Sequence, residues 1–375
     1  MRIFLVAGEP SGDRLGAALM KGLRDLAPGI ELRGVGGPAM IGRGLDSMIP
    51  MERLSVMGLA EVVPRLPELF RLRDRAARAA VDWGADALVT IDSPDFGLRV
   101  ASKVRRARPG IVTVHYVAPS VWAWRPGRAD RMARVVDHVL ALLPFEPPYM
   151  EAAGMTCDFV GHPVVSAPRA SAAEAEAFRA RHGERILLVL PGSRVGEVSR
   201  LAPTFGAALR GLPPDVAVVV PTLPHLAARV RALVAAWPVR AAVVCGEADR
   251  LAAFASAEVA LAASGTVSVE LAANRVPMVI AYDMAWLSRT VLSHLLKVES
   301  VTLVNLLTRT RAVPEYLGRA CRPAPIGEAV RALLSNPDAR EAQREALARA
   351  MALLGAGGED PGRRAARSVL ARLGT

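Results

Sequence analysis

The chain has 375 residues, of which 52% are hydrophobic and 22% charged. This excludes an intrinsically disordered protein and predicts two domains, each with a core of its own. The formal net charge of +11 suits nucleic acid, an anionic membrane surface or a phosphorylated substrate. The three cysteines lie far apart in the sequence, which favours a reducing compartment over a disulfide framework.

The first residues, MRIFLVAGEPSGD, form a short apolar strand that runs into a glycine-containing loop. They lack the long apolar core of a secretory signal peptide. No uncharged apolar run reaches the roughly 18 residues that a membrane-spanning helix needs. We therefore expect a protein that is soluble, or that lies on a membrane surface without crossing it.

Short apolar runs alternate with amphipathic segments along the first half of the chain. Buried strands are predicted at 3–8, 87–92, 112–117, 138–143 and 157–162. Helices are predicted at 13–26, 65–82, 96–107 and 127–136. Strands that alternate with helices in this way indicate an α/β fold, with a parallel sheet covered by helices on both faces.

The alternation lapses between 165 and 183, where the sequence is Ala-rich and polar, and then restarts. Strands are predicted at 185–194, 216–222, 241–246, 259–265 and 277–282, with helical sequence at 337–375. We expect two Rossmann-like domains at 1–165 and 185–355, with a C-terminal helix at about 360–375 as a candidate to pack back on the first. Two such sheets facing each other place a ligand-binding cleft at the carboxyl ends of their strands.

Two loops at strand ends in the first half carry candidate catalytic groups. AGEPSGDRLG has glycines that permit close backbone approach to a ligand, although it lacks the G-x-G-x-x-G pattern of dinucleotide-binding loops. In TIDSPDFG, Asp92 ends a buried strand, where a carboxylate can serve as a general base. The alternatives are that Ser11 or Asp13 caps the first helix and that Asp92 caps the helix that follows it.

Two loops in the second half suit a nucleotide diphosphate. In LPGSRVGEV, Arg194 follows a tight turn beside a helix N-terminus and offers its guanidinium to phosphate oxygens. In ASGTVSVEL, Ser264, Gly265 and Thr266 lead into a helix, and Glu270 follows one turn later, where a carboxylate can bind two sugar hydroxyls. Either loop alone is an ordinary helix start, but two of them in one domain favour a diphosphate.

No metal site is predicted. His115, His138 and His162 each lie near a strand end, but no two of them have the spacing of metal ligands. Structural hydrogen bonds are the simpler role for each of these imidazoles.

An aromatic and basic segment, YVAPSVWAWRPGRADRM at 116–132, holds two of the five tryptophans. This composition is typical of an interfacial patch that holds a lipid phosphate or the bilayer surface. The candidates for lipid contact in this segment are Trp122, Trp124, Arg125, Arg128 and Arg131. Met57, in a methionine-rich segment, is a candidate for contact with acyl chains. The alternatives are core tryptophans beside a solvated arginine helix, and ordinary core packing for the methionines.

A series of motifs between about residues 3 and 318 resembles one known family. In chain order the motifs include AGEPSGD, GVGGPAM, IDSPDFG, HYVAPSVWAWRPGRA, VLALLPFEPPYMEAAG, LPGSRVGEV and ASGTVSVELA. Together they resemble the lipid-A-disaccharide synthase family, and SVWAWR and LLPFE are distinctive among them. The resemblance implies the GT-B glycosyltransferase fold and catalysis without a metal or other cofactor. It implies an inverting transfer that joins UDP-2,3-diacylglucosamine to 2,3-diacylglucosamine 1-phosphate, with release of UDP and a β-1,6-linked lipid A disaccharide 1-phosphate.

The resemblance also implies roles for residues of this sequence. Asp92 becomes the general base for the 6-hydroxyl of the acceptor. The implied nucleotide-sugar site comprises Glu9, Ser11, Arg194, Ser264, Gly265, Thr266, Glu270 and Asn305. Pro10, Ala118 and Val304 depart from the usual residues of the family, and so does the segment TRTRAVPEYL at 308–317.

The implied partners are the two acylated glucosamine substrates and the anionic inner-membrane surface, with no nucleic acid. The implied location is the cytoplasm, peripheral on the inner face of the inner membrane. The oligomeric state stays open, with a homodimer as one alternative. Another GT-B transferase or a UDP-sugar epimerase would share the UDP loops. A basic nucleic-acid-binding protein would explain the charge, but not two diphosphate loops and a carboxylate at a strand end.

Overall fold

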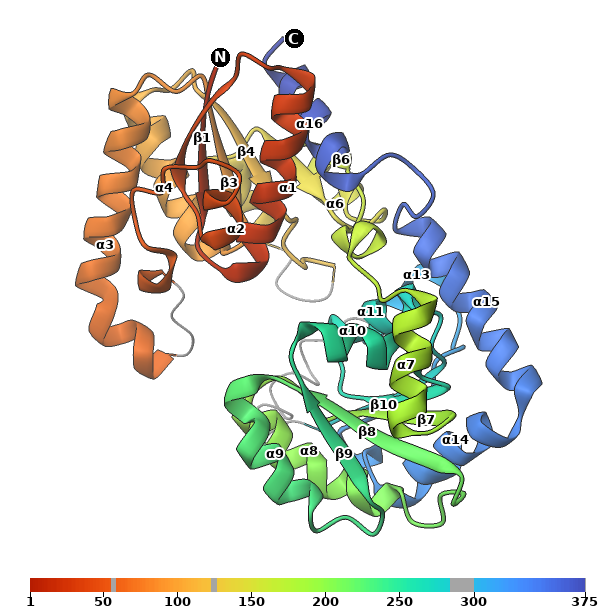
Figure 1. Ribbon diagram of the computed structural model, residues 1–375. Helices are drawn as coiled ribbons and strands as arrows, with labels where there is room; N and C mark the ends of the chain where they lie inside the picture. The colour runs from red at the N-terminus through yellow and green to blue at the C-terminus, as the bar shows by residue number, and fades with distance from the viewer. Residues whose placement is uncertain (55–58, 123–126, 284–299, 375) are drawn as a thin grey trace. The chain divides into compact units, whose positions relative to one another are not determined.

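The computed structural model describes residues 1–54, 59–122, 127–283 and 300–374 (Figure 1). The chain divides into two compact units, one formed by Met1–Ser166 with Gly357–Thr375 and the other by Ala167–Ala356. Each unit is built on a six-stranded sheet in which every described pair of neighbours is parallel. The predicted α/β class is therefore confirmed.

The sheet of the first unit has the strand order β2-β1-β3-β4-β5-β6. Its strands are β1 (Arg2–Ala7), β2 (Glu31–Val35), β3 (Ala87–Ile91), β4 (Val112–Tyr116), β5 (His138–Ala141) and β6 (Thr156–Phe159). Its helices are α1 (Pro10–Leu26), α2 (Pro38–Ile41), α3 (Leu59–Asp82), α4 (Pro94–Ala107), α5 (Arg128–Ala133), α6 (Pro147–Glu151) and α16 (Pro361–Arg372). Two 3-10 turns accompany them, η1 (Met51–Arg53) and η2 (Pro163–Ser166).

The sheet of the second unit has the strand order β12-β11-β10-β7-β8-β9. Its strands are β7 (Arg185–Leu190), β8 (Val216–Thr222), β9 (Ala241–Cys245), β10 (Val259–Ala262), β11 (Met278–Tyr282) and β12 (Glu315–Leu317). Its described helices are α7 (Ala172–His182), α8 (Val195–Ala208), α9 (Ala227–Val234), α10 (Glu247–Ser256), α11 (Val267–Ala273), α13 (Leu303–Thr308), α14 (Pro323–Ser335) and α15 (Pro337–Leu353). The 3-10 turns are η3 (Pro224–Leu226) and η4 (Gly318–Ala320).

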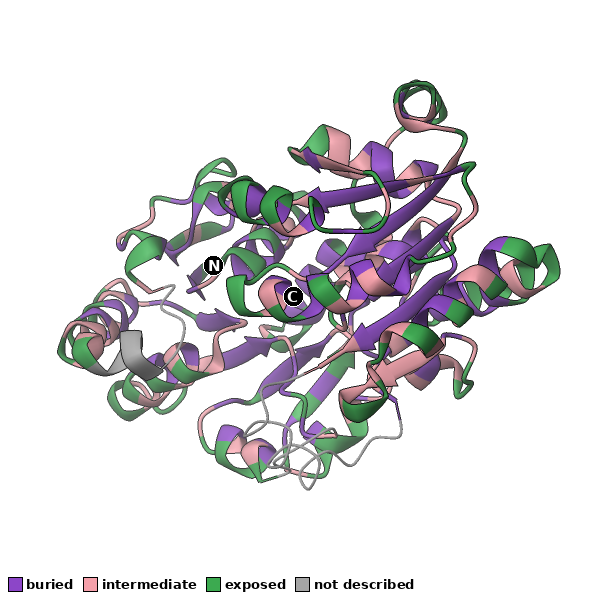
Figure 2. Cartoon of the chain, turned by 90° about the horizontal axis from the view of Figure 1, so that it is seen from below, coloured by how far each residue is buried: buried purple, intermediate pink, exposed green. Residues whose placement is uncertain are grey.

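Burial explains which strands the sequence reveals. β3 and β10 are buried along their whole length, because helices cover both faces of each sheet and the strand sequences are therefore continuously apolar (Figure 2). β2 and β12 were not predicted. Both are edge strands with the sequences ELRGV and EYL, and they are partly exposed. Their polar residues conceal the strand signal.

The helix starts are specified locally. Ser171 and Glu174 form a capping box at the start of α7, in which each side chain binds the backbone N–H of the other residue. Proline occupies an early position of several helices, where its missing N–H costs no helical hydrogen bond, as at Pro10, Pro94, Pro323, Pro337 and Pro361. The boundary that differs most from the prediction is the start of α3, because this helix begins at Leu59 and continues through Pro64 and Pro67.

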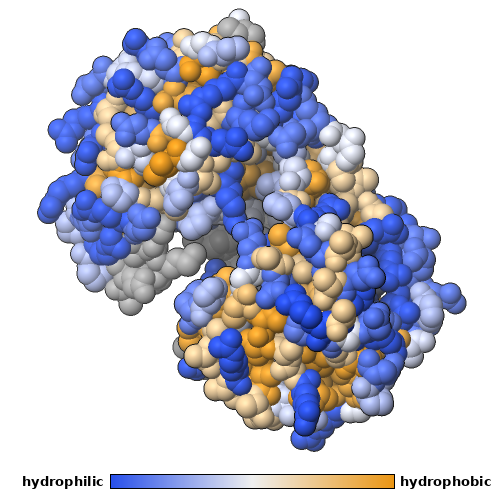
Figure 3. All heavy atoms as spheres, in the orientation of Figure 1, coloured by the Kyte–Doolittle hydropathy of each residue, from blue (hydrophilic) through white to orange (hydrophobic). Residues whose placement is uncertain are grey.

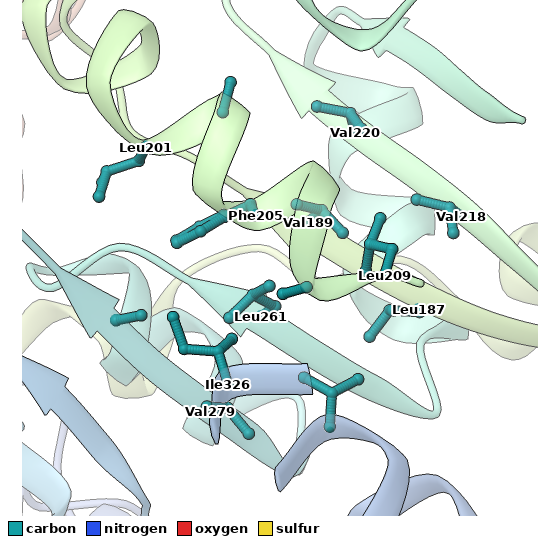
Figure 4. Close-up of a cluster of buried hydrophobic side chains, with 14 of the residues drawn as sticks. Leu187, Val189, Leu201, Phe205, Leu209, Val218, Val220, Leu261, Val279 and Ile326 are labelled. Carbon is teal, nitrogen blue, oxygen red and sulfur yellow. The ribbon is translucent and has the colours of Figure 1, made fainter. Parts of the chain in front are cut away.

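Each sheet packs its helices through apolar side chains. In the first unit, α1 and α16 cover one face, whereas Leu72 of α3 and Val100 of α4 pack on the other. In the second unit, Phe205 of α8 and Ile326 of α14 lie against Val189 and Leu261 of the sheet (Figure 4). Within the described part of the chain, no helix is long and apolar enough to cross a bilayer.

The C-terminal helix α16 belongs to the first unit. A Cβ placed on Gly22 of α1 would lie 2.7 Å from the carbonyl oxygen of Gly362, so the two helices pack with their backbones almost in contact. Ser368 Oγ donates to Asp158 Oδ2 at 2.6 Å and lies 2.7 Å from Nε2 of the buried His138. Burial lowers the pKa of His138 to about 4, so a neutral imidazole joins α16 to the sheet.

Candidate functional site

The loops that follow β1 and β3 meet at the carboxyl edge of the first sheet. β1 and β3 are neighbours, with Ala7 paired to Ile91, so their loops start side by side. Ser11 Oγ donates to Asp92 Oδ2 at 2.5 Å, and Ser93 Oγ donates to Glu9 Oε1 at 2.5 Å. The structure thus brings Glu9, Ser11 and Asp92 together through two reciprocal hydrogen bonds.

The backbone at this point is strained and tightly packed. Asp92 and Ser93 both have positive φ, at 52° and 39°, a region that costs free energy for residues with a side chain and that concentrates at functional sites. A Cβ on Gly12 would lie 2.9 Å from the carbonyl oxygen of Ile91. Gly12 therefore allows α1 to approach the end of β3 closely enough for Ser11 to reach Asp92.

The helix-capping alternatives are wrong in this structure. Glu9 is the N-cap of α1 and Ser93 the N-cap of α4, and neither side chain makes a capping hydrogen bond. Asp13 is buried and accepts from the backbone N–H groups of Gly37, Ala39 and Met40, at 2.8 to 3.0 Å. Asp13 thus holds the GVGGPAM loop, whereas Asp92 is half-buried and bound by a hydroxyl.

His115 lies behind the Asp92 loop, on β4. It is fully buried, and its Nδ1 lies 2.7 Å from Oγ1 of Thr90 on β3. Burial lowers the pKa of His115 to about 4, although the charge of Asp92 opposes this shift. The imidazole is therefore neutral at physiological pH and supports the strand pair that carries Asp92.

Trp122 anchors its loop to the fold. Its ring stands edge-on to Phe145, with 5.1 Å between centroids, and its Nε1 donates to Glu146 Oε1 at 3.3 Å. Arg128 and Arg131 lie on α5, half-buried and exposed respectively. Three of the residues predicted to contact lipid lie outside the described residues, namely Met57, Trp124 and Arg125.

The loops that follow β7 and β10 meet at the carboxyl edge of the second sheet. Leu190 pairs with Ala262, so the loop with Arg194 starts beside the loop with Ser264, Gly265 and Thr266. Arg194 is the N-cap of α8 and its side chain is 66% exposed. Gly265 and Thr266 are exposed as well. Three of the predicted nucleotide-site residues are therefore exposed in loops that start side by side, and Ser264 in the second loop is half-buried.

Glu270 and Asn305 have partners within the second unit. Glu270 Oε2 accepts from Arg250 Nη1 at 3.2 Å. Asn305 is buried, and its amide makes two hydrogen bonds to the backbone of Val313, with Nδ2 donating at 2.8 Å and Oδ1 accepting at 3.0 Å. The structure gives the Asn305 amide a role in the fold, and its place in the nucleotide site stays a prediction.

In residues 1–54, 59–122, 127–283 and 300–374, no three His, Cys, Asp or Glu side chains come together as metal ligands.

Two open hollows, of about 650 and 750 Å³, flank β9 and share Val239, Arg240 and Ala241. Figure 3 shows hydrophobic residues over this region of the second unit, where β8 and β9 lie in Figure 1. Neither hollow includes a predicted site residue.

The motifs and the geometry agree with the relatives of this chain. A family model described as lipid-A-disaccharide synthetase matches residues 3–360. The chain belongs to this family. It is 55% identical to a lipid-A-disaccharide synthase from Ruegeria pomeroyi, over 100% of this chain and 96% of that protein. It is 50% identical to a lipid-A-disaccharide synthase from Rhodospirillum centenum, over 98% and 94%.

Solved structures identify the fold. A UDP-GlcNAc 2-epimerase from Neisseria meningitidis bound to UDP-GlcNAc is similar with a TM-score of 0.64, 11% identity and coverage of 100% of both chains. MurG from Acinetobacter baumannii is similar with a TM-score of 0.57 and 15% identity, over 100% of this chain and 99% of that one. At these identities the likeness shows the fold alone, and it confirms the predicted GT-B class.

Three carboxylates at the site were missed as functional or supporting residues. Asp13, Glu146 and Glu197 all lie within motifs that carried the family resemblance. Glu197 stands three residues after the N-cap of α8, the spacing of a capping box, so its contact with the loop could have been predicted. Which backbone N–H groups surround Asp13 depends on a tertiary contact and could not.

Glu146 makes the stability of the first unit depend on pH. It is 4% exposed, and burial raises its pKa from 4.5 to about 7. Because the folded-state pKa is the higher one, the stabilising contribution is complete below about pH 4.5 and is lost as pH rises through about 7. Glu146→Gln removes this pH-dependent loss, although its single amide oxygen keeps only one of the two acceptors, because Trp122 donates to Oε1 and Leu143 to Oε2. We expect wild type to lose on the order of 3 kcal/mol relative to the variant between about pH 5 and pH 8.

Urea unfolding at the two pH values measures this difference. Glu151→Gln is the matched control, because Glu151 is an exposed carboxylate at the end of α6. If the free energy of unfolding changes with pH in the same way for wild type and Glu146→Gln, the raised pKa of Glu146 is contradicted.

Proposed function

We propose that this chain is an inverting glycosyltransferase that makes the lipid A disaccharide. It would transfer diacylglucosamine from UDP to the 6-hydroxyl of diacylglucosamine 1-phosphate. The observation that carries the proposal is the half-buried Asp92 carboxylate, fixed by Ser11 at the carboxyl edge of the first sheet in a chain of this family. The relatives favour neither an epimerase nor a nucleic-acid-binding protein.

Asp92 is suited to the role of general base. Ser11 occupies one carboxylate oxygen, Oδ2, which orients the group and directs Oδ1 toward a substrate hydroxyl. As the hydroxyl oxygen of the acceptor forms its bond to the anomeric carbon, its proton passes to Asp92 and the bond from that carbon to UDP breaks. Attack opposite the leaving diphosphate inverts the configuration at the anomeric carbon.

Arg194 and its neighbouring loop are suited to the departing diphosphate. The guanidinium offers several N–H donors to phosphate oxygens, and its 66% exposed side chain can reach a ligand. The exposed Gly265 allows close approach of the ligand to the backbone, with φ at 146°. Arg194 would stabilise the negative charge that develops on UDP, the contribution that a divalent ion makes in other transferases.

The acylated substrates imply that the protein works at an anionic inner-membrane surface, on its cytoplasmic face. The basic helix α5 supports this part of the proposal, because Arg131 is exposed there and Arg128 precedes it by one turn. Trp122 packs against Phe145 and Glu146. We therefore assign the proposed membrane contact to the arginines of α5 and not to this ring.

Asp92→Asn tests the base. The amide keeps an oxygen for Ser11 but cannot take a proton, so turnover should fall by about 10²-fold or more while the Kd for UDP changes little. Asp95→Asn is the matched control, since Asp95 is an exposed carboxylate in the first turn of α4. The measurement is product formation from the two lipid precursors, and near wild-type turnover in Asp92→Asn would remove Asp92 from the mechanism.

Arg194→Ala tests the diphosphate site. Loss of a charge-assisted contact should weaken UDP binding by roughly 1.5–3 kcal/mol, as measured by calorimetry. Arg240→Ala, at the amino end of β9 and exposed, should bind UDP like wild type. Because the guanidinium replaces a metal ion in this proposal, product formation should also survive excess EDTA. Inactivation by EDTA with rescue by Mg²⁺ would overturn the metal-free mechanism.

Charge reversal at Arg128 and Arg131 tests the membrane surface. Each basic residue near an anionic bilayer contributes on the order of 1 kcal/mol, so Arg128→Glu/Arg131→Glu should co-sediment less with vesicles that contain phosphatidylglycerol. UDP binding should be unchanged, because the proposed diphosphate loops with Arg194 and Gly265 lie in the second unit. Equal sedimentation of the variant and wild type at low salt would exclude α5 from the contact.

A further inference from the structure

We propose that Glu197 is a positioning residue for the diphosphate loop: it fixes the loop by accepting from the backbone N–H of Ser193, and it holds Arg194 in the orientation that a UDP diphosphate requires. The inference rests on the proposed function of Arg194 and deepens it. It concerns a residue one helical turn into α8, in the middle of the motif LPGSRVGEV.

The carboxylate of Glu197 accepts hydrogen bonds from three donors, which come from two parts of the second unit. Ser193 N donates to Oε2 at 3.3 Å, and Arg194 Nη1 donates to Oε1 at 3.2 Å. Tyr282 Oη donates to the same Oε1 at 3.3 Å. Two of these donors belong to the loop after β7, and the third is at the end of β11.

The loop is shaped around this side chain. Gly192 has φ at 119°, and a Cβ placed on it would lie 2.8 Å from Cβ and from Oε2 of Glu197. The backbone thus passes directly over the carboxylate, which leaves room for no residue other than glycine without a shift. Glu197 is 16% exposed, whereas its partner Arg194 is 66% exposed. The carboxylate is the fixed member of the pair and the guanidinium the accessible one.

Tyr282 ties this arrangement to the sheet. In the strand order, β10 lies between β11 and β7, so the contact from Tyr282 to Glu197 connects the end of β11 with α8, the helix that follows β7. The loop with Ser264 and Gly265 begins at the end of β10. Burial raises the pKa of Tyr282, and the nearby Glu197 carboxylate adds to that shift, in agreement with a neutral phenol that donates to a charged acceptor.

A guanidinium on an exposed side chain samples many rotamers, and ordering it is part of the cost of binding a ligand. One ion pair leaves the other N–H groups of Arg194 available while restricting where they point. The alternative role for Glu197 is a helix cap alone, because a glutamate in the first turn satisfies free N–H groups. A cap predicts lower stability of the second unit with unchanged UDP affinity.

The test measures UDP affinity and thermal stability in the full-length protein. The variants are Glu197→Ala, Glu197→Gln, which keeps an acceptor but ends the ion pair, and Tyr282→Phe. Glu184→Gln is the matched control, because Glu184 is exposed at the opposite end of β7. Calorimetry is run well below the lowest melting temperature. We expect Glu197→Ala to raise the Kd for UDP by about 3- to 10-fold, with a smaller increase for the other two variants and none for Glu184→Gln.

Non-additivity gives the decisive result. If Glu197 acts through Arg194, then Arg194→Ala/Glu197→Ala should bind UDP about as weakly as Arg194→Ala alone. An unchanged Kd in Glu197→Ala with a lowered melting temperature would leave only the cap, and tighter binding would make the carboxylate a competitor of the diphosphate. Either result overturns this inference while Arg194→Ala still reports on the site. Wild-type protein that does not bind UDP would overturn the proposed function itself. If Glu197→Ala does not fold, the Kd values for UDP are compared in the same way for Glu197→Gln, alone and combined with Arg194→Ala.

Discussion

The in-register pairing of parallel neighbouring strands is the constraint on which both candidate sites depend. Ala7 pairs with Ile91 in the first sheet, and Leu190 pairs with Ala262 in the second. Parallel neighbours end at the same edge, so loops that lie far apart in the sequence begin side by side. The hydrogen bond from Ser11 to Asp92 exists only because β1 and β3 stop at the same level. A register shift of one strand would separate these side chains.

The environment of each carboxylate, rather than its chemistry, decides what it does. Asp13 accepts from three backbone N–H groups and is buried, so its acceptor capacity serves the fold. Glu146 is also buried, but the loss of hydration dominates its surroundings and raises its pKa. Asp92 is half-buried and is held by the hydroxyl of Ser11. It is therefore oriented by the fold while remaining open to a substrate.

The fold and the family could be predicted from the sequence because their signals are local. Buried strands such as RILLVL are continuous apolar runs, and the loops after them carry recognisable motifs. The edge strands β2 and β12 lack that signal, since half-exposed residues need not be apolar. Asn305 was assigned to the nucleotide site from its motif, but its amide is bound to Val313. Such a pairing depends on which loop lies opposite, and the order of residues does not specify it.

The two ends of β7 show why net charge alone predicts no ligand. At the amino end, Arg185 donates to Glu258, Asp215 and the carbonyl of Leu334, at 2.8 to 3.1 Å. Its five N–H donors are largely used within the fold. At the carboxyl end and within the described chain, Arg194 has a single hydrogen-bonded partner, Glu197. Both residues contribute equally to the charge of +11. Only the arginine beyond the carboxyl end of the strand keeps donors for an anion, and that is where parallel sheets bind their ligands.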